Sequence, residues 1–366
     1  MRDYFDLGTY TRPVTTRSER AREWVRRGLL WTYAFNHEEA MACFQQAVQA
    51  DPHCALAYWG LAYALGPNYN KPWEAFEPDE AASAVAQAHA AVANARRHAA
   101  GAAGAEQALI AALTHRYPQD APAAEWSVWN HAYADAMRAA YREHPADLDV
   151  AVLFADALMN LTPWALWNTA TGQPAEGAAT VEARAVLEGV LAHADGRVHP
   201  GALHLYIHLM EMSPRPEDAL WAGELLRDLV PDAGHLLHMP THLDVLCGDY
   251  KQVVASNAAA ISADDRFVAA RGSTNFYTLY RAHNYHFKIY GAMFLGQSRL
   301  ALETADALAT AIPESLLRVP LPPMANWLEG FVQAAIIEQQ LRVGQARADV
   351  HIGASCYCRL TVPYLP

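Results

Sequence analysis

Apolar residues recur at helical rather than alternating spacing over almost the whole of this 366-residue chain. Residues with a strong helix preference, mainly Ala, Leu, Glu, Gln and Arg, dominate 82–114, 124–143, 181–194 and 323–342. No run of Val, Ile, Thr and aromatic residues alternates for more than a few positions, as a half-buried strand would. Pro and Gly interrupt the pattern mostly every 15 to 35 residues or so, which suits helical hairpins. The sequence therefore predicts an all-α fold.

Composition and charge exclude several classes of protein. Hydrophobic residues make up 52% of the chain and charged residues 18%, so a large core can form. The net charge is -12 and no basic stripe is interleaved with aromatic residues, so we expect no nucleic-acid partner. No stretch approaches the roughly 20 apolar residues of a membrane span. The first residues lack the apolar segment of a secretory signal, and the five cysteines form no disulfide framework. We therefore expect a soluble cytoplasmic protein.

The clearest repeat covers residues 21–54. Its pattern comprises Trp24, Gly28, Trp31, Ala40, Phe44, Ala47 and Pro52. At these spacings the segment resembles a unit of the tetratricopeptide-repeat (TPR) superfamily, although Arg27 and Trp31 stand where Leu and Tyr are usual. The resemblance implies antiparallel helix pairs that stack into a right-handed solenoid, which can curl into a compact superhelix around a central groove.

Small residues and turn signals place three later repeats without using any histidine. These units cover about 200–233, 234–267 and 282–315, and the third follows an insertion around Asp264 to Phe276. We therefore expect a single TPR-like domain over 1–344. A C-terminal tail, 345–366, contains Cys356 and Cys358 and resembles no family that we can name.

The 17 histidines are the unusual feature of the composition. In TPR solenoids the first helix of each repeat lines the concave groove, and seven histidines fall on groove-lining positions of three consecutive repeats: His204, His208, His235, His238, His242, His283 and His286. Two pairs within this set are four residues apart, so each pair shares one helix face. Neutral imidazole is a common ligand of transition metals. We therefore predict that these histidines form one shared metal site. The alternative is a polar groove that binds no metal.

Pro240 bears on the middle repeat. It has no N–H to donate and crowds the preceding turn, so the helix is expected to begin or kink there. His235 and His238 would then lie on a loop that enters the helix, and His242 would be the firmest ligand of this repeat.

A second, narrower resemblance involves Gly234-His-Leu-Leu-His-Met-Pro-Thr-His242. This segment resembles a group of bacterial TPR-like proteins with a His-Met-Pro-Ser/Thr-His signature. Further matches are His204-Leu-Tyr-Ile-His208, His283-Asn-Tyr-His-Phe287 and Gly66-Pro-Asn-Tyr-Asn70. The resemblance covers roughly residues 20–310 and implies that these segments form one functional unit.

The donor set narrows the choice of metal. A site dominated by histidine, with few carboxylates and no nearby thiolate pair, favours copper, zinc or non-haem iron over magnesium or calcium. We expect copper first, with iron or zinc as alternatives, because paired His-x-x-x-His helices resemble the ligand spacing of coupled dicopper proteins. Tyr206 and Glu211 are the candidate catalytic residues. The phenol could relay a proton, and the carboxylate could complete a zinc set with His204 and His208.

A small organic substrate would enter the same groove. Its candidate binding residues are Asn68, Asn70, Trp59, Trp164, Trp167 and Tyr290. The asparagine amides could hydrogen-bond a ligand, and the aromatic rings could wall an apolar pocket. Their structural alternatives are turn formation for the asparagines and core packing for the aromatic residues.

Three functions remain open from the sequence. The first is a metal-dependent oxidoreductase that acts on a small organic molecule. The second is a non-enzymatic interaction module that holds a protein or peptide partner in the TPR groove. The third is a zinc-dependent hydrolase, although the His-Glu-x-x-His string of one large class is absent.

Overall fold

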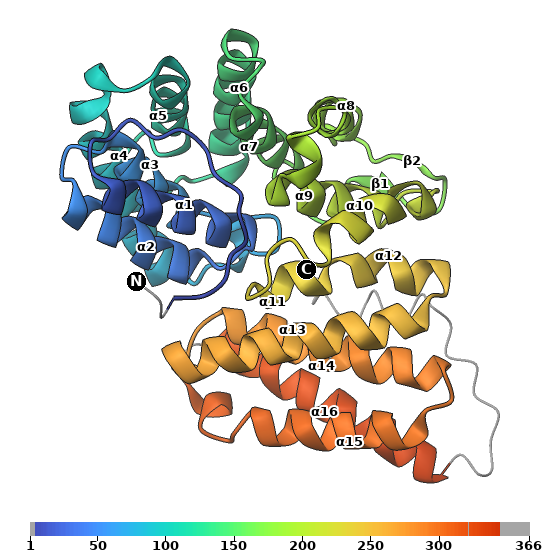
Figure 1. The fold of residues 1–366 in the computed structure, drawn as a ribbon. Coiled ribbons are helices and arrows are strands. Elements are labelled where there is room, and N and C mark those ends of the chain that lie inside the picture. Colours follow the sequence, from blue (N-terminus) through green and yellow to red (C-terminus); the bar gives the residue numbers. More distant parts are fainter. Residues whose placement is uncertain (1–3, 321, 345–366) are drawn as a thin grey trace. The chain divides into compact units, whose positions relative to one another are not determined.

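The computed structural model describes residues 4–320 and 322–344. This part of the chain is mostly helical, and it divides into two compact units, one that ends at Val230 and one that begins at Pro231. Helices that follow one another in the sequence pack against each other within each unit (Figure 1). The prediction of an all-α fold is therefore confirmed, and the TPR solenoid stays a prediction. The tail 345–366, with Cys356 and Cys358, lies outside the described residues.

The first unit contains most of the elements. In chain order its α-helices are α1 (Glu19–Tyr33), α2 (His37–Ala50), α3 (Ala55–Ala64), α4 (Pro78–His98), α5 (Gly104–Arg116), α6 (Trp126–Glu143), α7 (Leu148–Met159), α8 (Thr180–Leu191), α9 (Pro200–Met210) and α10 (Leu220–Leu226). Short 3-10 helices are η1 (Trp73–Ala75), η2 (Ala99–Gly101), η3 (Gly196–Val198) and η4 (Pro216–Ala219). An antiparallel pair, β1 (Trp167–Asn168) and β2 (Gln173–Pro174), lies between α7 and α8.

The second unit is wholly helical in its described part. It contains α11 (Gly234–His238), α12 (Pro240–Cys247), α13 (Tyr250–Arg271), α14 (Tyr277–Phe294), α15 (Ser298–Ala311), η5 (Leu316–Arg318) and α16 (Pro322–Gly344). The expected start at Pro240 is confirmed, because this residue opens α12. The loop expected for His235 and His238 is wrong, since both residues lie on the short helix α11. Part of the segment expected as an insertion, around Asp264 to Phe276, lies in α13, which continues to Arg271. Long helices α13 and α14 pack side by side, and α15 and α16 pack on α14 (Figure 1).

The first hairpin shows why the repeat-like residues fall where they do. Ser18 and Asn36 cap α1 and α2 by accepting backbone N–H groups of the first turn. Phe44 of α2 is fully buried between two glycines. A Cβ atom would lie 2.7 Å from the Phe44 ring at Gly28 and 2.3 Å from it at Gly60. The missing side chains therefore let α1 and α3 approach the ring closely.

A buried carboxylate connects several segments of the first unit. Asp149 of α7 accepts a hydrogen bond from Tyr10 Oη at 2.7 Å and another from the Tyr33 hydroxyl. Arg12 Nη1 lies 3.3 Å from Oδ2, and His199 Nε2 lies 3.3 Å from Oδ1. Burial alone would raise the pKa of Asp149, but Arg12 and His199 hold it well below its ordinary value. Because His199 directly precedes α9, this cluster fixes the start of that helix against α1 and α7.

A second buried carboxylate lies in the second unit. Asp264 of α13 accepts a hydrogen bond from Asn284 Nδ2 of α14 at 2.7 Å. Gly234 opens α11 beside it, and a Cβ there would lie 1.9 Å from Asp264 Oδ1. Burial raises the pKa of Asp264 to about 8, and the Asn284 hydrogen bond opposes the rise. The carboxyl group is therefore largely protonated in the folded protein at neutral pH.

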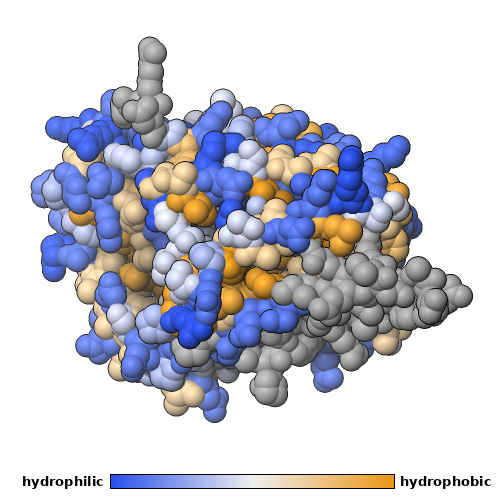
Figure 2. Space-filling view, turned by 90° about the horizontal axis from the view of Figure 1, so that it is seen from below, coloured by the Kyte–Doolittle hydropathy of each residue, from blue (hydrophilic) through white to orange (hydrophobic). Residues whose placement is uncertain are grey.

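No described helix is both long and apolar enough to cross a membrane. On the face in Figure 2, hydrophilic residues are interspersed with hydrophobic ones.

Replacing Asp149 with Ala should strongly destabilise the first unit. The change removes one partner of a buried ion pair and the acceptor of two tyrosine hydroxyls, so we expect the free energy of unfolding to fall by about 3–5 kcal/mol. Urea unfolding followed by circular dichroism measures the loss. Glu217→Gln, which changes an exposed ion pair with Arg215, is the matched control and should shift the free energy by less than about 0.5 kcal/mol. Equal effects of the two changes would contradict the role given to Asp149.

Replacing Asp264 with Asn should flatten the pH dependence of stability. The folded-state pKa lies above the unfolded value, so the folded state binds more protons and is destabilised as pH rises from about 4 to 8. The slope from this one group is at most about 1.4 kcal/mol per pH unit. Urea unfolding at pH 5 and pH 8 should show a smaller loss for Asp264→Asn than for the unmodified chain. Glu303→Gln, at an exposed position, should retain the original slope.

Candidate metal centre

Three histidines of the second unit converge. His238 ends α11, His242 lies in the first turn of α12, and His283 lies on α14. Each offers one ring nitrogen, and these nitrogens lie within 4.8 Å of one another. The Nε2 atoms of His238 and His242 are 2.8 Å apart. We refer to these three residues as the triad; its geometry is compatible with a transition metal.

A hydrogen bond orients the first ring of the triad. Asn257 of α13 donates its amide N–H to the Val253 carbonyl at 2.7 Å, so its Oδ1 is turned towards His238. That Oδ1 lies 2.7 Å from His238 Nδ1. An amide oxygen can only accept, so Nδ1 carries the proton and the Nε2 lone pair is directed at the other two rings. Asn257 thereby sets the tautomer that a metal ligand requires.

One phenyl ring contacts the whole triad. Phe287 lies one helical turn after His283 on α14, and its centroid is 4.7 Å from His238, 5.1 Å from His242 and 4.6 Å from His283. His238 is fully buried, whereas the other two rings are half-buried. The triad therefore has an apolar wall on one side and partial access to solvent.

The first unit holds a second set of oriented imidazoles. His204 and His208 are one turn apart on α9, with ring centroids 4.8 Å apart, and both are buried. His204 Nδ1 lies 2.6 Å from the Tyr33 carbonyl oxygen, and His208 Nδ1 lies 2.8 Å from Glu211 Oε1. Both partners are acceptors, so in each neutral ring Nδ1 carries the proton and Nε2 has the lone pair. We refer to these two residues as the α9 pair.

Aromatic rings from three separate segments surround the α9 pair. Phe35 lies 4.4 Å from His204 and stacks on His208 at 5.8 Å. Tyr69 and Trp164 lie 5.0 and 5.5 Å from His208. Phe35 and Trp164 adopt φ angles of 55° and 59°, which is unusual for aromatic residues. Such a conformation costs about 1–3 kcal/mol and is retained where the surroundings enforce it, often at functional sites.

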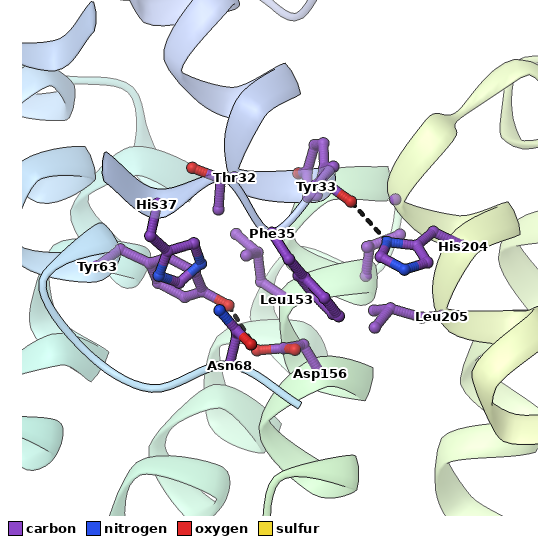
Figure 3. Close-up of a pocket in the computed structure, with 12 residues that line it drawn as sticks. Thr32, Tyr33, Phe35, His37, Tyr63, Asn68, Leu153, Asp156, His204 and Leu205 are labelled. Atoms are coloured by element: carbon purple, nitrogen blue, oxygen red, sulfur yellow. Dashed lines mark hydrogen bonds between the residues drawn. The ribbon is translucent and has the colours of Figure 1, made fainter. Parts of the chain in front are cut away.

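A small cavity borders His204 (Figure 3). Its volume of about 10 Å³ is close to the minimum for one water molecule. His204 and Tyr33 lie at one end in the view, Phe35 crosses the middle, and His37 lies towards the other end. Burial, reinforced by the Arg116 charge, lowers the pKa of His37 to about 3, so its imidazole is neutral.

The predicted substrate residues have different environments. Asn68 lines the cavity, but its Oδ1 accepts the backbone N–H groups of Asn70 and Lys71 at 2.9 Å, which is a turn-forming role. Trp59 is buried and stacks on Tyr63 at 5.2 Å, as a core residue does. Neither Asn70 nor Trp59 is among the cavity-lining residues.

The remaining predicted aromatic residues also lie in different environments. Within the first unit, the Trp164 ring packs against His208 of the α9 pair. Trp167 donates its indole N–H to the Leu209 carbonyl at 2.6 Å, which links β1 to the end of α9. Tyr290 packs on Phe294 near the end of α14, with centroids 4.7 Å apart.

The two predicted catalytic residues are arranged differently from each other. Tyr206 lies two positions from each member of the α9 pair, which places it on the opposite side of the helix. Its hydroxyl donates to Glu188 at 3.3 Å, and burial, with Glu188 as a further cause, raises the pKa of the phenol to about 12. Glu211 does contact the pair, but through Nδ1 of His208, so it positions the ring.

Two predicted ligands of the second unit, His286 and His235, are not members of the triad. His286 Nε2 is 2.7 Å from the Phe331 carbonyl oxygen, and burial lowers its pKa. The backbone N–H of His235 donates to the Tyr277 hydroxyl at 2.9 Å, and its ring lies 6.1 Å from that of His238. A single centre shared by all seven histidines stays a prediction.

Sequence reasoning missed the residues that orient and enclose the imidazoles. They are Asn257, Phe287, Tyr69, Phe35 and the Tyr33 carbonyl. Tyr69 and Phe287 do lie within the short motifs quoted above, so those motifs carried a signal for them. Asn257 is a polar residue inside an Ala-rich helix, which is the only local hint of its role.

No protein-family model matches the chain, and no curated protein matches it.

Proposed function

We propose that this protein is a metal-dependent oxidoreductase whose metal is held by His238, His242 and His283. The observation that carries the proposal is the convergence of three ring nitrogens within 4.8 Å, one of them with its tautomer set by Asn257. Two of the ligands lie on either side of Pro240, at the end of α11 and in the first turn of α12, and the third comes from α14. A buried imidazole with an outer acceptor on Nδ1 is the usual arrangement of a metal-binding histidine.

Copper fits this donor set best. The three donors are neutral nitrogens, whereas non-haem iron in oxygenases is usually held by two histidines and a carboxylate. When bound, copper supplies one-electron exchange with a small organic substrate. The protein holds the ligand rings in place, with Phe287 excluding water from one side of them. The partial exposure of His242 and His283 leaves access for a small molecule.

A zinc-dependent hydrolase is the second candidate. A three-histidine set with a free coordination position is also the arrangement that activates a zinc-bound water. The triad supports this alternative better than the set of His204, His208 and Glu211 does. In that set the carboxylate already accepts a hydrogen bond from the His208 ring.

Replacing His242 with Ala should remove one equivalent of metal per chain, because two ligands hold a transition ion far more weakly than three. The measurement is elemental analysis of untagged protein, together with electron paramagnetic resonance of the copper-loaded form. The unmodified protein should give a Cu(II) signal that ascorbate abolishes and air restores. Circular dichroism should show unchanged helicity, and His193→Ala, at an exposed position, should keep the metal.

Two outcomes would contradict this proposal. One is less than about 0.2 equivalents of any transition metal in the unmodified protein, with no gain on reconstitution. The other is that the His242→Ala variant holds as much metal per chain as the unmodified protein does. Retention of zinc alone, with activity that does not depend on an electron acceptor, would support the hydrolase instead.

Replacing Asn257 with Ala should weaken metal binding about 10- to 100-fold, because the His238 ring loses the acceptor that sets its tautomer. Asn257→Asp keeps an oxygen acceptor at the same position and should retain most of the affinity. Competition titration of copper against a chromophoric chelator measures both variants. If Ala and Asp lower the affinity equally, Asn257 acts through packing rather than through the ring nitrogen.

A further inference from the structure

We propose that the α9 pair forms a second metal site, and that this site binds the cuprous ion, Cu(I). The proposal concerns the first unit alone, with ligands different from those of the triad. It does not depend on the triad binding metal.

The ligand atoms are set before any metal arrives. His204 and His208 each offer a ring nitrogen, and the two nitrogens lie within 4.8 Å of each other. The Tyr33 carbonyl and Glu211 each accept from an Nδ1–H, so both rings present Nε2 as the donor atom. Cu(I) has a filled d shell and is stable with as few as two nitrogen ligands, so the pair is a sufficient donor set for it.

The surroundings favour a singly charged ion. The α9 pair is buried, and Phe35, Tyr69 and Trp164 pack against its rings. The penalty for taking an ion out of water grows with the square of its charge, so a divalent ion pays about four times as much as Cu(I). Aromatic faces also attract a cation, which partly offsets the loss of hydration.

Unusual backbone conformations and a buried hydrogen bond hold the aromatic rings around the α9 pair. Two of its three rings, those of Phe35 and Trp164, are carried by residues with positive φ. They come from the α1–α2 turn and from the segment before β1. Tyr69 comes from a third segment, in which the Pro67 carbonyl accepts a hydrogen bond from Arg116 Nη2 at 2.7 Å. Three independent segments are thus held so that their rings meet one histidine, which ordinary core packing does not require.

A full-length variant that lacks the triad tests the proposal. The triple change His238→Ala, His242→Ala and His283→Ala removes the other metal set, and Cu(I) is then titrated without oxygen against bicinchoninate. We expect one equivalent of Cu(I) per chain, a loss of at least 100-fold in affinity on adding His208→Ala, and no change on adding His193→Ala. Phe35→Leu, which removes a ring but keeps an apolar side chain, should weaken Cu(I) binding about tenfold.

Single substitutions in the otherwise unmodified chain test the proposal even if the triple variant does not fold. His208→Ala and His242→Ala should each reduce Cu(I) binding from two equivalents to one, with circular dichroism unchanged. If either single change removes both equivalents, or if the triad-free variant binds no Cu(I), the second site is refuted. Tighter binding of Zn(II) than of Cu(I) by the triad-free variant would refute the cuprous assignment. If the unmodified chain binds a single equivalent, which His208→Ala removes and His242→Ala does not, this site stands and the proposed function is refuted instead.

Discussion

A buried imidazole N–H needs a hydrogen-bond acceptor, and this requirement shapes both sets of histidines. In the triad, Asn257 accepts from His238; in the α9 pair, the Tyr33 carbonyl and Glu211 accept from the two rings. Each acceptor lies on the Nδ1 side and leaves Nε2 as the donor atom. The acceptors come from a different turn or a different helix, so ring orientation depends on the packing of the whole unit around them.

In the first unit, the orientation of the α9 pair depends on buried charged groups and on strained backbone close to it. His199 precedes α9 and lies against Asp149, whose other partners come from the N-terminal segment and from α1. His199 also caps α9 by accepting the backbone N–H of Ala202 at 3.2 Å. A helix placed by an ion-pair network can present its histidines at a fixed position, and the aromatic residues with positive φ are then held by contact with them.

Much of the fold was accessible from the sequence, because helical periodicity and the positions of Pro and Gly are local properties. They predicted the all-α class, the hairpin of α1 and α2 and the start at Pro240. The length of α13 was not predicted, because the repeat spacing indicates only where one unit ends and not how far its last helix continues. The prediction of a shared helix face is confirmed for His204 and His208, which both lie on α9. It is wrong for His238 and His242, which lie on α11 and α12, although their rings still meet. The approach of His283 to one pair, and the roles of Asn257, Phe287 and Phe35, depend on contacts between helices that no local pattern encodes.

The 2.8 Å separation of the His238 and His242 Nε2 atoms has a consequence for how the triad exchanges ions with its surroundings. Since His238 presents a lone pair there, the proton in this contact belongs to His242. A cation bound at the His242 Nε2 requires the other tautomer of this ring, with the proton on Nδ1. Acid competes with the cation for the ring nitrogens, because a protonated imidazole has no lone pair to offer. A chain that holds its ion firmly in a neutral compartment would give it up in an acidic one.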